Sequence, residues 1–316
     1  MKEYRAIRQQ HSFLEMCRTP ELATEVTLQP VRRFDLDAAI IFSDILLPLE
    51  KMGIPLKFSD AGGPVIEKPV RSRQDVTDLR TIQPEQDLPY VLEAIEMTCR
   101  ELSGKTPLIG FCGAPFTLAS YLIEGGGSKN YQLAKNLMYS EPDTFHLLME
   151  KLTDMAATYL NSQVEHGASA VQVFDSWIGT LSVQDYRTYV LPHMKRLFSS
   201  LTASAPSIHF GVGTAHLLEL MREAGGTVLG VDWRLPIDEA WQITGTDRAI
   251  QGNLDPVSLF SSFEHIEGRV KDILDRVANR PGHVFNLGHG ILPTTPLDKV
   301  EFLIDTVHRH SRRTGV

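Results

Sequence analysis

The sequence predicts one α/β domain over residues 1–316, with the fold of a (β/α)8 barrel, the TIM-type barrel. Two observations indicate this class: short apolar segments alternate with long amphipathic ones, and the apolar segments end in polar residues or glycine. The competing class, a doubly wound open sheet, usually carries a GxGxxG turn after its first strand, and this sequence has none there. Seven strands are predicted, so one strand of a complete barrel is unaccounted for.

The predicted strands are short and rich in apolar residues, as expected for a parallel sheet covered by helices. In chain order they span residues 37–43, 107–113, 170–176, 207–212, 228–233, 249–254 and 283–288. Active sites of barrel enzymes assemble where such strands end, from several strands at once. The polar residues at these ends are therefore candidate site residues, namely Asp44, Asp175, Ser176, Asp232, Asn253 and His289.

Two helices are clear from the spacing of their apolar residues. Residues 141–166 form the longer one, and Gly167 is predicted to end it as a C′ glycine. Residues 214–224 form the shorter one, with Thr214 as the N-cap and Gly225 at its end.

Two other segments are predicted to be irregular. Residues 53–87 are rich in proline, glycine and charge, and we interpret them as an insertion in a βα loop. Residues 124–129, EGGGSK, lack the spacing of a P-loop and are better interpreted as a mobile lid. Tyr121 precedes this segment as a candidate hydroxyl donor.

Composition indicates a soluble, cytoplasmic protein. Hydrophobic residues make up 42% of the chain and charged residues 22%, and the formal charge of −8 disfavours a nucleic acid or an anionic membrane as partner. The three cysteines include no CxxC pair, so neither a disulfide framework nor a zinc ribbon is predicted. No apolar segment approaches the ~20 residues of a membrane span, and the N-terminus has no signal-peptide pattern.

The candidate site residues each have a structural alternative. Asp44 follows a strand, where an aspartate often caps the next helix, and its segment taken by itself favours that role. Asp175 and Ser176 could likewise be a capping pair. His289 stands between two glycines after the last strand, which suits a ligand contact and a hydrogen-bonding loop residue equally well. Metal ligands at recognisable spacings are absent from the sequence.

Five motifs, in the same order along the chain, resemble the uroporphyrinogen decarboxylase family. They are residues 37–46, 107–115, the EGGGSK of 124–129, the QGNLDP of 251–256 and the NLGHG of 286–290. The resemblance runs from about Glu3 to the C-terminus. It implies a cofactor-free (β/α)8 barrel without a metal, typically a homodimer. It also implies the conversion of uroporphyrinogen III into coproporphyrinogen III by loss of four acetate carboxylates, a step of haem biosynthesis.

The resemblance also implies roles for particular residues. Protonation of a pyrrole ring carbon makes the ring an electron sink, so the protein must stabilise a cation. Asp44 matches the catalytic aspartate of the family, an ionised acceptor for the pyrrole N–H groups. Tyr121, Ser176 and His289 match donors to the substrate carboxylates, and Arg8 matches a basic residue near the site.

The sequence departs from the family at its start. Family members carry an MRQAGR-type motif, whose arginines hold the substrate, just before the part that matches residues 3–5. This motif would supply the uncounted strand, and we expect Met1 to be a start assigned too far downstream. The alternatives are an inactive, truncated homologue that binds tetrapyrroles and a corrinoid-dependent methyltransferase of the same superfamily. The latter binds zinc through an HxC pair, whereas residues 209–211 here are HFG.

Overall fold

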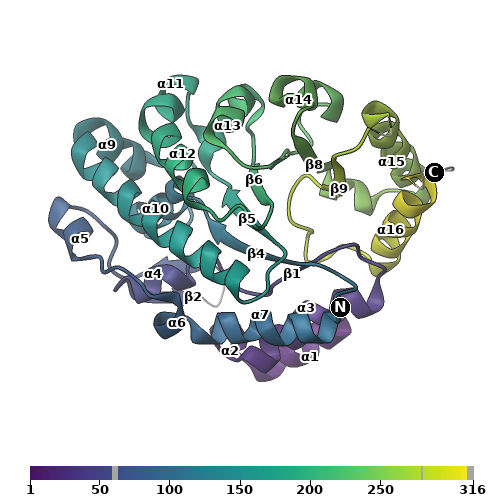
Figure 1. The fold of residues 1–316 in the computed structure, drawn as a ribbon, viewed down its shortest axis with the longest axis horizontal. Helices are drawn as coiled ribbons and strands as arrows, with labels where there is room; N and C mark the ends of the chain where they lie inside the picture. Colours follow the sequence, from purple (N-terminus) through teal and green to yellow (C-terminus); the bar gives the residue numbers. More distant parts are fainter. Residues whose placement is uncertain (59–62, 279, 312–316) are drawn as a thin grey trace.

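A curled parallel sheet forms the centre of the molecule (Figure 1). The computed structural model describes residues 1–58, 63–278 and 280–311. The seven strands of this central sheet follow one another in the order β1-β4-β5-β6-β7-β8-β9, and every neighbouring pair is parallel. This confirms the TIM-type α/β class, and each strand lies within its predicted segment: β1 Ala39–Ile40, β4 Leu108–Gly113, β5 Ala170–Asp175, β6 Ser207–Gly211, β7 Val228–Gly230, β8 Ala249–Leu254 and β9 His283–Leu287.

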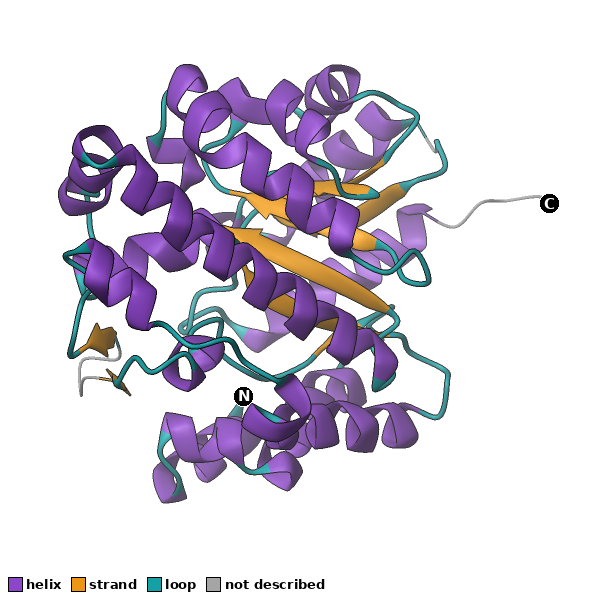
Figure 2. Cartoon of the chain, turned by 60° about the vertical axis from the view of Figure 1, so that its left-hand side comes forward, coloured by secondary structure: helices purple, strands orange, loops and turns teal. Residues whose placement is uncertain are grey.

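Helices pack around the strands, as Figure 2 shows. Several begin with a proline in the first turn, where its missing N–H costs nothing and its fixed φ suits the helix. The helices are α1 Lys2–Gln10, α2 Phe13–Arg18, α3 Pro20–Arg33, α4 Leu47–Lys51, α5 Arg73–Asp78, α6 Pro84–Asp87, α7 Pro89–Leu102, α8 Pro115–Glu124, α9 Gln132–Ser140, α10 Pro142–Glu165, α11 Val183–Asp185, α12 Leu191–Ser200, α13 Leu218–Ala224, α14 Ile237–Thr244, α15 Phe263–Val277 and α16 Leu297–Ser311.

The two predicted helices are present, but one of their caps is wrong. Helix α10 ends before Gly167, whose φ of +113° is the left-handed conformation expected of a C′ glycine. Gly225 ends α13 with a φ of +130°. Thr214 does not cap that helix. It is buried and enters a 3-10 turn, Ala215–Leu217, and its hydroxyl makes no capping hydrogen bond.

The segment 53–87 is an excursion between β1 and β4, as predicted. It contains an antiparallel pair, β2 Leu56–Phe58 and β3 Pro64–Ile66, followed by α5 and α6. The Ile66 N–H donates to the Gly125 carbonyl at 3.0 Å, and the Val70 N–H donates to the Leu122 carbonyl at 2.9 Å. These bonds attach the excursion to the end of α8, next to the segment 124–129.

The two faces of the sheet have different surroundings. Strand register places Phe111, Phe174 and Phe210 on the concave face, where neighbouring rings meet edge to face at 5.5 and 6.0 Å. The alternate residues, such as Val173, face the helices. The apolar core lies between sheet and helices, with side chains such as Phe116 and Val173 fully buried. Phe111 and Phe174 stay half-buried, so the concave face offers apolar surface to a ligand.

Strands β1 and β9 are the two edges of the sheet. His308 on α16 contacts the segment just before β1. Its imidazole lies 3.1 Å from the Asp37 carboxylate and 3.8 Å from the Asp35 carboxylate. Throughout residues 1–58, 63–278 and 280–311, no helix is both long and apolar enough to span a lipid bilayer.

Candidate active site

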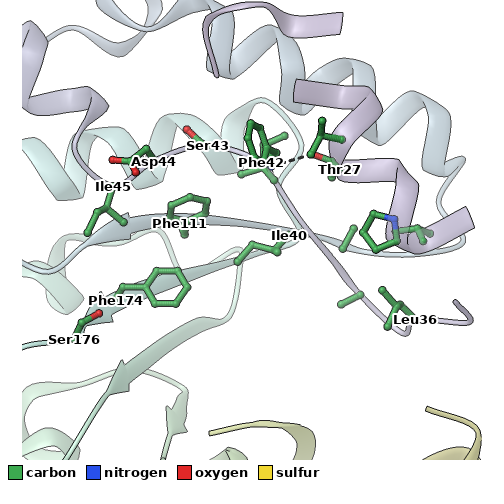
Figure 3. Close-up of a pocket in the computed structure, with 16 residues that line it drawn as sticks. Thr27, Leu36, Ile40, Phe42, Ser43, Asp44, Ile45, Phe111, Phe174 and Ser176 are labelled. Carbon is green, nitrogen blue, oxygen red and sulfur yellow. Dashed lines mark hydrogen bonds between the residues drawn. The ribbon is translucent and has the colours of Figure 1, made fainter. Parts of the chain in front are cut away.

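A cavity of about 600 Å³ opens on the concave side of the sheet, beside β1. Its volume lies within the range of about 300–1,000 Å³ that is usual for small-molecule sites. Most of its lining is apolar and comes from α3, from residues 38–45 and from Phe111 and Phe174. In Figure 3 the rings of Phe111 and Phe174 lie next to Ile40, with Asp44 and Ser176 at the end of the cavity formed by the strand termini. Hydrophobic walls with few polar groups are typical of a binding site.

Asp44 is held in this cavity by the chain that follows β1. Its Oδ1 accepts the Leu46 N–H at 2.8 Å, and α4 begins one residue later. The predicted capping role is wrong, because the N-cap of α4 is Leu46 and no side chain caps this helix; the Asp44 oxygen binds the backbone N–H of that N-cap residue. Burial raises the pKa of Asp44 from 3.8 to about 6, against the opposing effect of the Leu46 bond.

Over the described residues Asp44 forms no ion pair, and only one of its two carboxylate oxygens accepts a hydrogen bond. A carboxylate that is desolvated and unpaired destabilises the folded protein, so such a group indicates a functional site. The chemistry that would complement it is an N–H donor or a positively charged ring.

Tyr121 lies near Asp44 on α8. Burial and then the negative charge of Asp44 raise the pKa of its phenol, which keeps the hydroxyl protonated and able to donate. Its ring meets Trp177 edge to face at 5.9 Å, and Trp177 in turn lies 5.7 Å from Tyr131. Trp177 directly follows Ser176, so the same short segment carries two of the residues around the site.

Ser176 faces the cavity, whereas the preceding Asp175 faces the helices, as the alternation along β5 requires. Asp175 is not a helix cap. It is fully buried, accepts the Thr117 hydroxyl at 3.3 Å and lies 3.5 Å from the buried imidazole of His209 on β6. Burial raises the pKa of Asp175, and His209 offsets part of this effect. The hydroxyl oxygen of Thr117 also accepts the backbone N–H of Trp177 at 3.4 Å. This network fixes β5 against α8, the helix that carries Tyr121.

The segment 124–129 is held by polar contacts. Oε1 of Glu124 accepts the N–H groups of Leu133 and Ala134 at 2.9 and 3.0 Å, at the start of α9. The Ser128 hydroxyl accepts the Tyr131 N–H at 3.0 Å. The segment thus connects α8 to α9 beside Tyr121, and its role as a mobile lid stays a prediction.

Three of the five predicted site residues, Tyr121, Arg8 and His289, lie outside the cavity lining. Arg8 is exposed on α1, where its guanidinium donates to the His11 carbonyl at 2.9 Å. His289 is exposed after β9 and contacts Trp233 edge to face at 6.5 Å. The structure therefore brings Asp44 and Ser176 into one cavity, and the roles of all five residues stay predictions.

Sequence reasoning missed one charged residue at the strand ends. Arg234 follows Asp232 and Trp233 at the end of β7, and its guanidinium both donates to Asp232 and lies 4.3 Å over the Trp233 ring. An arginine two residues after a strand-end aspartate was the only signal available. For metals, the described side chains offer no group of three histidine, cysteine, aspartate or glutamate ligands.

Comparison with known proteins identifies related sequences and folds. A family model described as uroporphyrinogen decarboxylase (URO-D) matches residues 1–310. The uroporphyrinogen decarboxylase of Carboxydothermus hydrogenoformans is 57% identical over 312 residues, which cover 98% of this chain and 89% of that protein. The one from Sorangium cellulosum is 54% identical over 309 residues, covering 98% and 88%. A solved methyltransferase from Methanosarcina mazei has a TM-score of 0.81 at 20% identity, over 93% of this chain and 87% of that one, which shows the fold alone.

Proposed function

The chain belongs to the uroporphyrinogen decarboxylase family, and we propose that Asp44 drives the reaction of this carboxy-lyase, the removal of carbon dioxide from the four acetate side chains of uroporphyrinogen III. The product is coproporphyrinogen III, an intermediate of haem biosynthesis. One observation carries the role of Asp44: its buried carboxylate has no cation beside it among the described residues, and it faces a cavity walled by apolar side chains.

The reaction passes through a positively charged pyrrole ring, which the protein must stabilise electrostatically. An acetate on a pyrrole loses carbon dioxide only if the electrons of the broken C–C bond have somewhere to go. When a ring carbon takes up a proton, the ring becomes a cation that accepts this electron pair. Carbon dioxide leaves, the former methylene carbon takes up a proton to become a methyl group, and the ring carbon returns its own. Each decarboxylation consumes one proton, four for the complete conversion, and needs no other reactant.

Asp44 suits this cation as an ionised acceptor. Its pKa of about 6 leaves it ionised near neutral pH, and the Leu46 N–H fixes one oxygen while the other can accept pyrrole N–H groups. Because the carboxylate is already in place and already desolvated, little reorganisation is needed as the positive charge develops. Preorganised groups of this kind typically lower a barrier by about 3–4 kcal/mol.

The remaining residues bind and orient the substrate in this proposal. Phe111 and Phe174 provide the apolar surface against which the tetrapyrrole rests. Ser176 and Tyr121 donate to the side-chain carboxylates close to Asp44, whereas His289 and Arg8 meet those carboxylates that extend outward. No cofactor is needed for the reaction as written.

We also propose that the protein is a homodimer in the cytoplasm, as membership of this family implies. Its formal charge of −8 supports the absence of a nucleic-acid partner. Light scattering coupled to gel filtration would give a mass near twice the 35.3 kDa of the chain, and a mass of one chain would contradict the dimer.

The ionisation of Asp44 should appear in the pH dependence of the reaction. Because burial raises its pKa to about 6, we expect kcat/KM to fall about tenfold per pH unit below pH 6 and to level off above pH 7. Coproporphyrinogen formation, followed anaerobically by chromatography between pH 5 and 8, measures this.

Asp44→Asn serves as the control for titration of the substrate itself. The residual activity of this variant should lack the acidic limb, because the amide does not titrate. An identical acidic limb in both proteins would assign it to another group and contradict the proposed role of Asp44.

A further inference from the structure

We propose that Arg234, with Trp233 and His289, forms a carboxylate-binding subsite for a substrate side chain remote from the reacting acetate. The inference rests on the proposed function, because it assigns the subsite to a tetrapyrrole that carries several carboxylates. Arg234 follows β7 and His289 follows β9. In a parallel sheet these ends share one rim with Asp44, which follows β1.

The guanidinium of Arg234 is held from two sides. Asp232 beneath it is only 4% exposed, and its carboxylate accepts the Gly213 N–H at 2.5 Å and the Arg234 backbone N–H at 3.0 Å. The same carboxylate accepts one guanidinium N–H from Arg234. On its other side the guanidinium carbon lies 4.3 Å from the centre of the Trp233 ring. An arginine fixed in this way loses little conformational entropy when it binds a ligand.

Donors on this guanidinium remain free for a ligand. Its side-chain bond to Asp232 uses Nη1, and over the described residues neither Nε nor Nη2 donates to an acceptor. The Arg234 side chain is 48% exposed, so these N–H groups can be reached from solvent. A planar group with several donors matches a carboxylate in a two-pronged geometry, which a point charge cannot do.

The end of β9, two strands along the sheet from β7, brings a histidine to the same turn. A Cβ atom on Gly288 would lie 2.7 Å from the backbone nitrogen of Trp233 and 3.1 Å from the Cα of Asp232. The end of β9 is therefore packed directly against this turn. His289 follows Gly288, and its ring lies 6.5 Å from the Trp233 ring between centres, with the two planes nearly perpendicular. Arg234 and His289 thus flank one indole at the rim of the sheet.

The alternative to a subsite is that Arg234 and Asp232 form an ordinary surface ion pair, such as the one between Arg222 and Asp247. In that pair, Asp247 is 63% exposed and both side chains extend into solvent, as in pairs that contribute little. Asp232 differs because it is buried and bound by two backbone N–H groups, which makes it a fixed support for the arginine.

Replacing Arg234 tests the subsite. We expect Arg234→Gln to raise KM for uroporphyrinogen III about tenfold or more, with kcat changed less than about threefold, because the lost bond is equally present before and during the reaction. Arg234→Lys should recover part of the loss, since it restores the charge without the two-pronged geometry. Arg222→Gln is the matched control and should leave both constants unchanged.

A binding measurement separates this inference from the proposed function. Quenching of tryptophan fluorescence by uroporphyrin I, which carries eight carboxylates, should show a Kd about tenfold weaker for Arg234→Gln than for Arg222→Gln. Equal Kd and KM values for the two variants would overturn the subsite while leaving the decarboxylase function standing. If the unaltered protein binds uroporphyrin I through Arg234 but releases no carbon dioxide, the proposed function is wrong and the subsite is supported.

Discussion

We expect Asp44→Asn to lower kcat for uroporphyrinogen III about a hundredfold to a thousandfold, because the proposed role of Asp44 is that of a preorganised charge opposite the developing cation. The amide keeps the shape of the side chain and can still accept the Leu46 N–H. The substituted enzyme should therefore bind substrate with a KM within a few-fold of the original, and the loss should fall on kcat. Initial rates of carbon dioxide release at pH 7.5 measure it.

The same substitution should stabilise the fold. With a folded-state pKa of about 6 against 3.8, Asp44 binds a proton more tightly in the folded protein, so its ionisation costs stability as the pH rises through 6. We expect Asp44→Asn to raise the free energy of unfolding by about 1–3 kcal/mol at pH 8, with the gain vanishing below about pH 4. Asp35→Asn, at a residue that is almost fully exposed, should change neither rate nor stability. A less active but equally stable variant would contradict the desolvated state of Asp44.

His209→Leu lowers the free energy of unfolding by about 3–5 kcal/mol at pH 8, because it leaves the Asp175 carboxylate buried without its imidazole partner. Burial already raises the pKa of Asp175. The loss should therefore shrink as the pH falls and the carboxyl group takes up a proton. Chemical denaturation at pH 5 and pH 8 measures both values.

A double replacement distinguishes the buried pair from simple packing. Asp175→Leu with His209→Leu removes both members of the buried pair, and such replacements are often neutral, so most of the lost stability should return. The double variant should still have a raised KM, because the Thr117 hydroxyl loses its acceptor and Trp177 its fixed position beside Tyr121. A double variant as unstable as His209→Leu would show that the cost comes from the shape of the imidazole.

The strands were predictable because each is an apolar run bounded by polar residues or glycine, which needs no tertiary information. Their lengths were harder to predict. Strand β1 covers only Ala39–Ile40 of its predicted segment: the Ile41 N–H still donates to the Ile109 carbonyl at 3.0 Å, and the next N–H, that of Phe42, donates to the Thr27 hydroxyl at 2.9 Å on the side away from β4. The predicted Thr214 cap is wrong because a buried 3-10 turn intervenes before α13.

The candidate site was predictable only where a polar side chain interrupts a buried segment. Asp44 met that condition, and its bond from the Leu46 N–H occupies only one of its two carboxylate oxygens. The pairing of Asp175 with His209 depends on the register of two neighbouring strands, which the sequence leaves open. The orientation of Arg234 likewise depends on Asp232 being buried beneath it.

The central claim is that the charge of Asp44 stabilises a protonated pyrrole. A single-turnover experiment, with enzyme in excess over uroporphyrinogen III at pH 7.5, isolates the chemical step from product release. We expect the unaltered protein to form partially decarboxylated products and then coproporphyrinogen III, with the first step at least about a hundredfold slower in Asp44→Asn. Equal rates in the two proteins, or a substrate left intact by both, would contradict the claim.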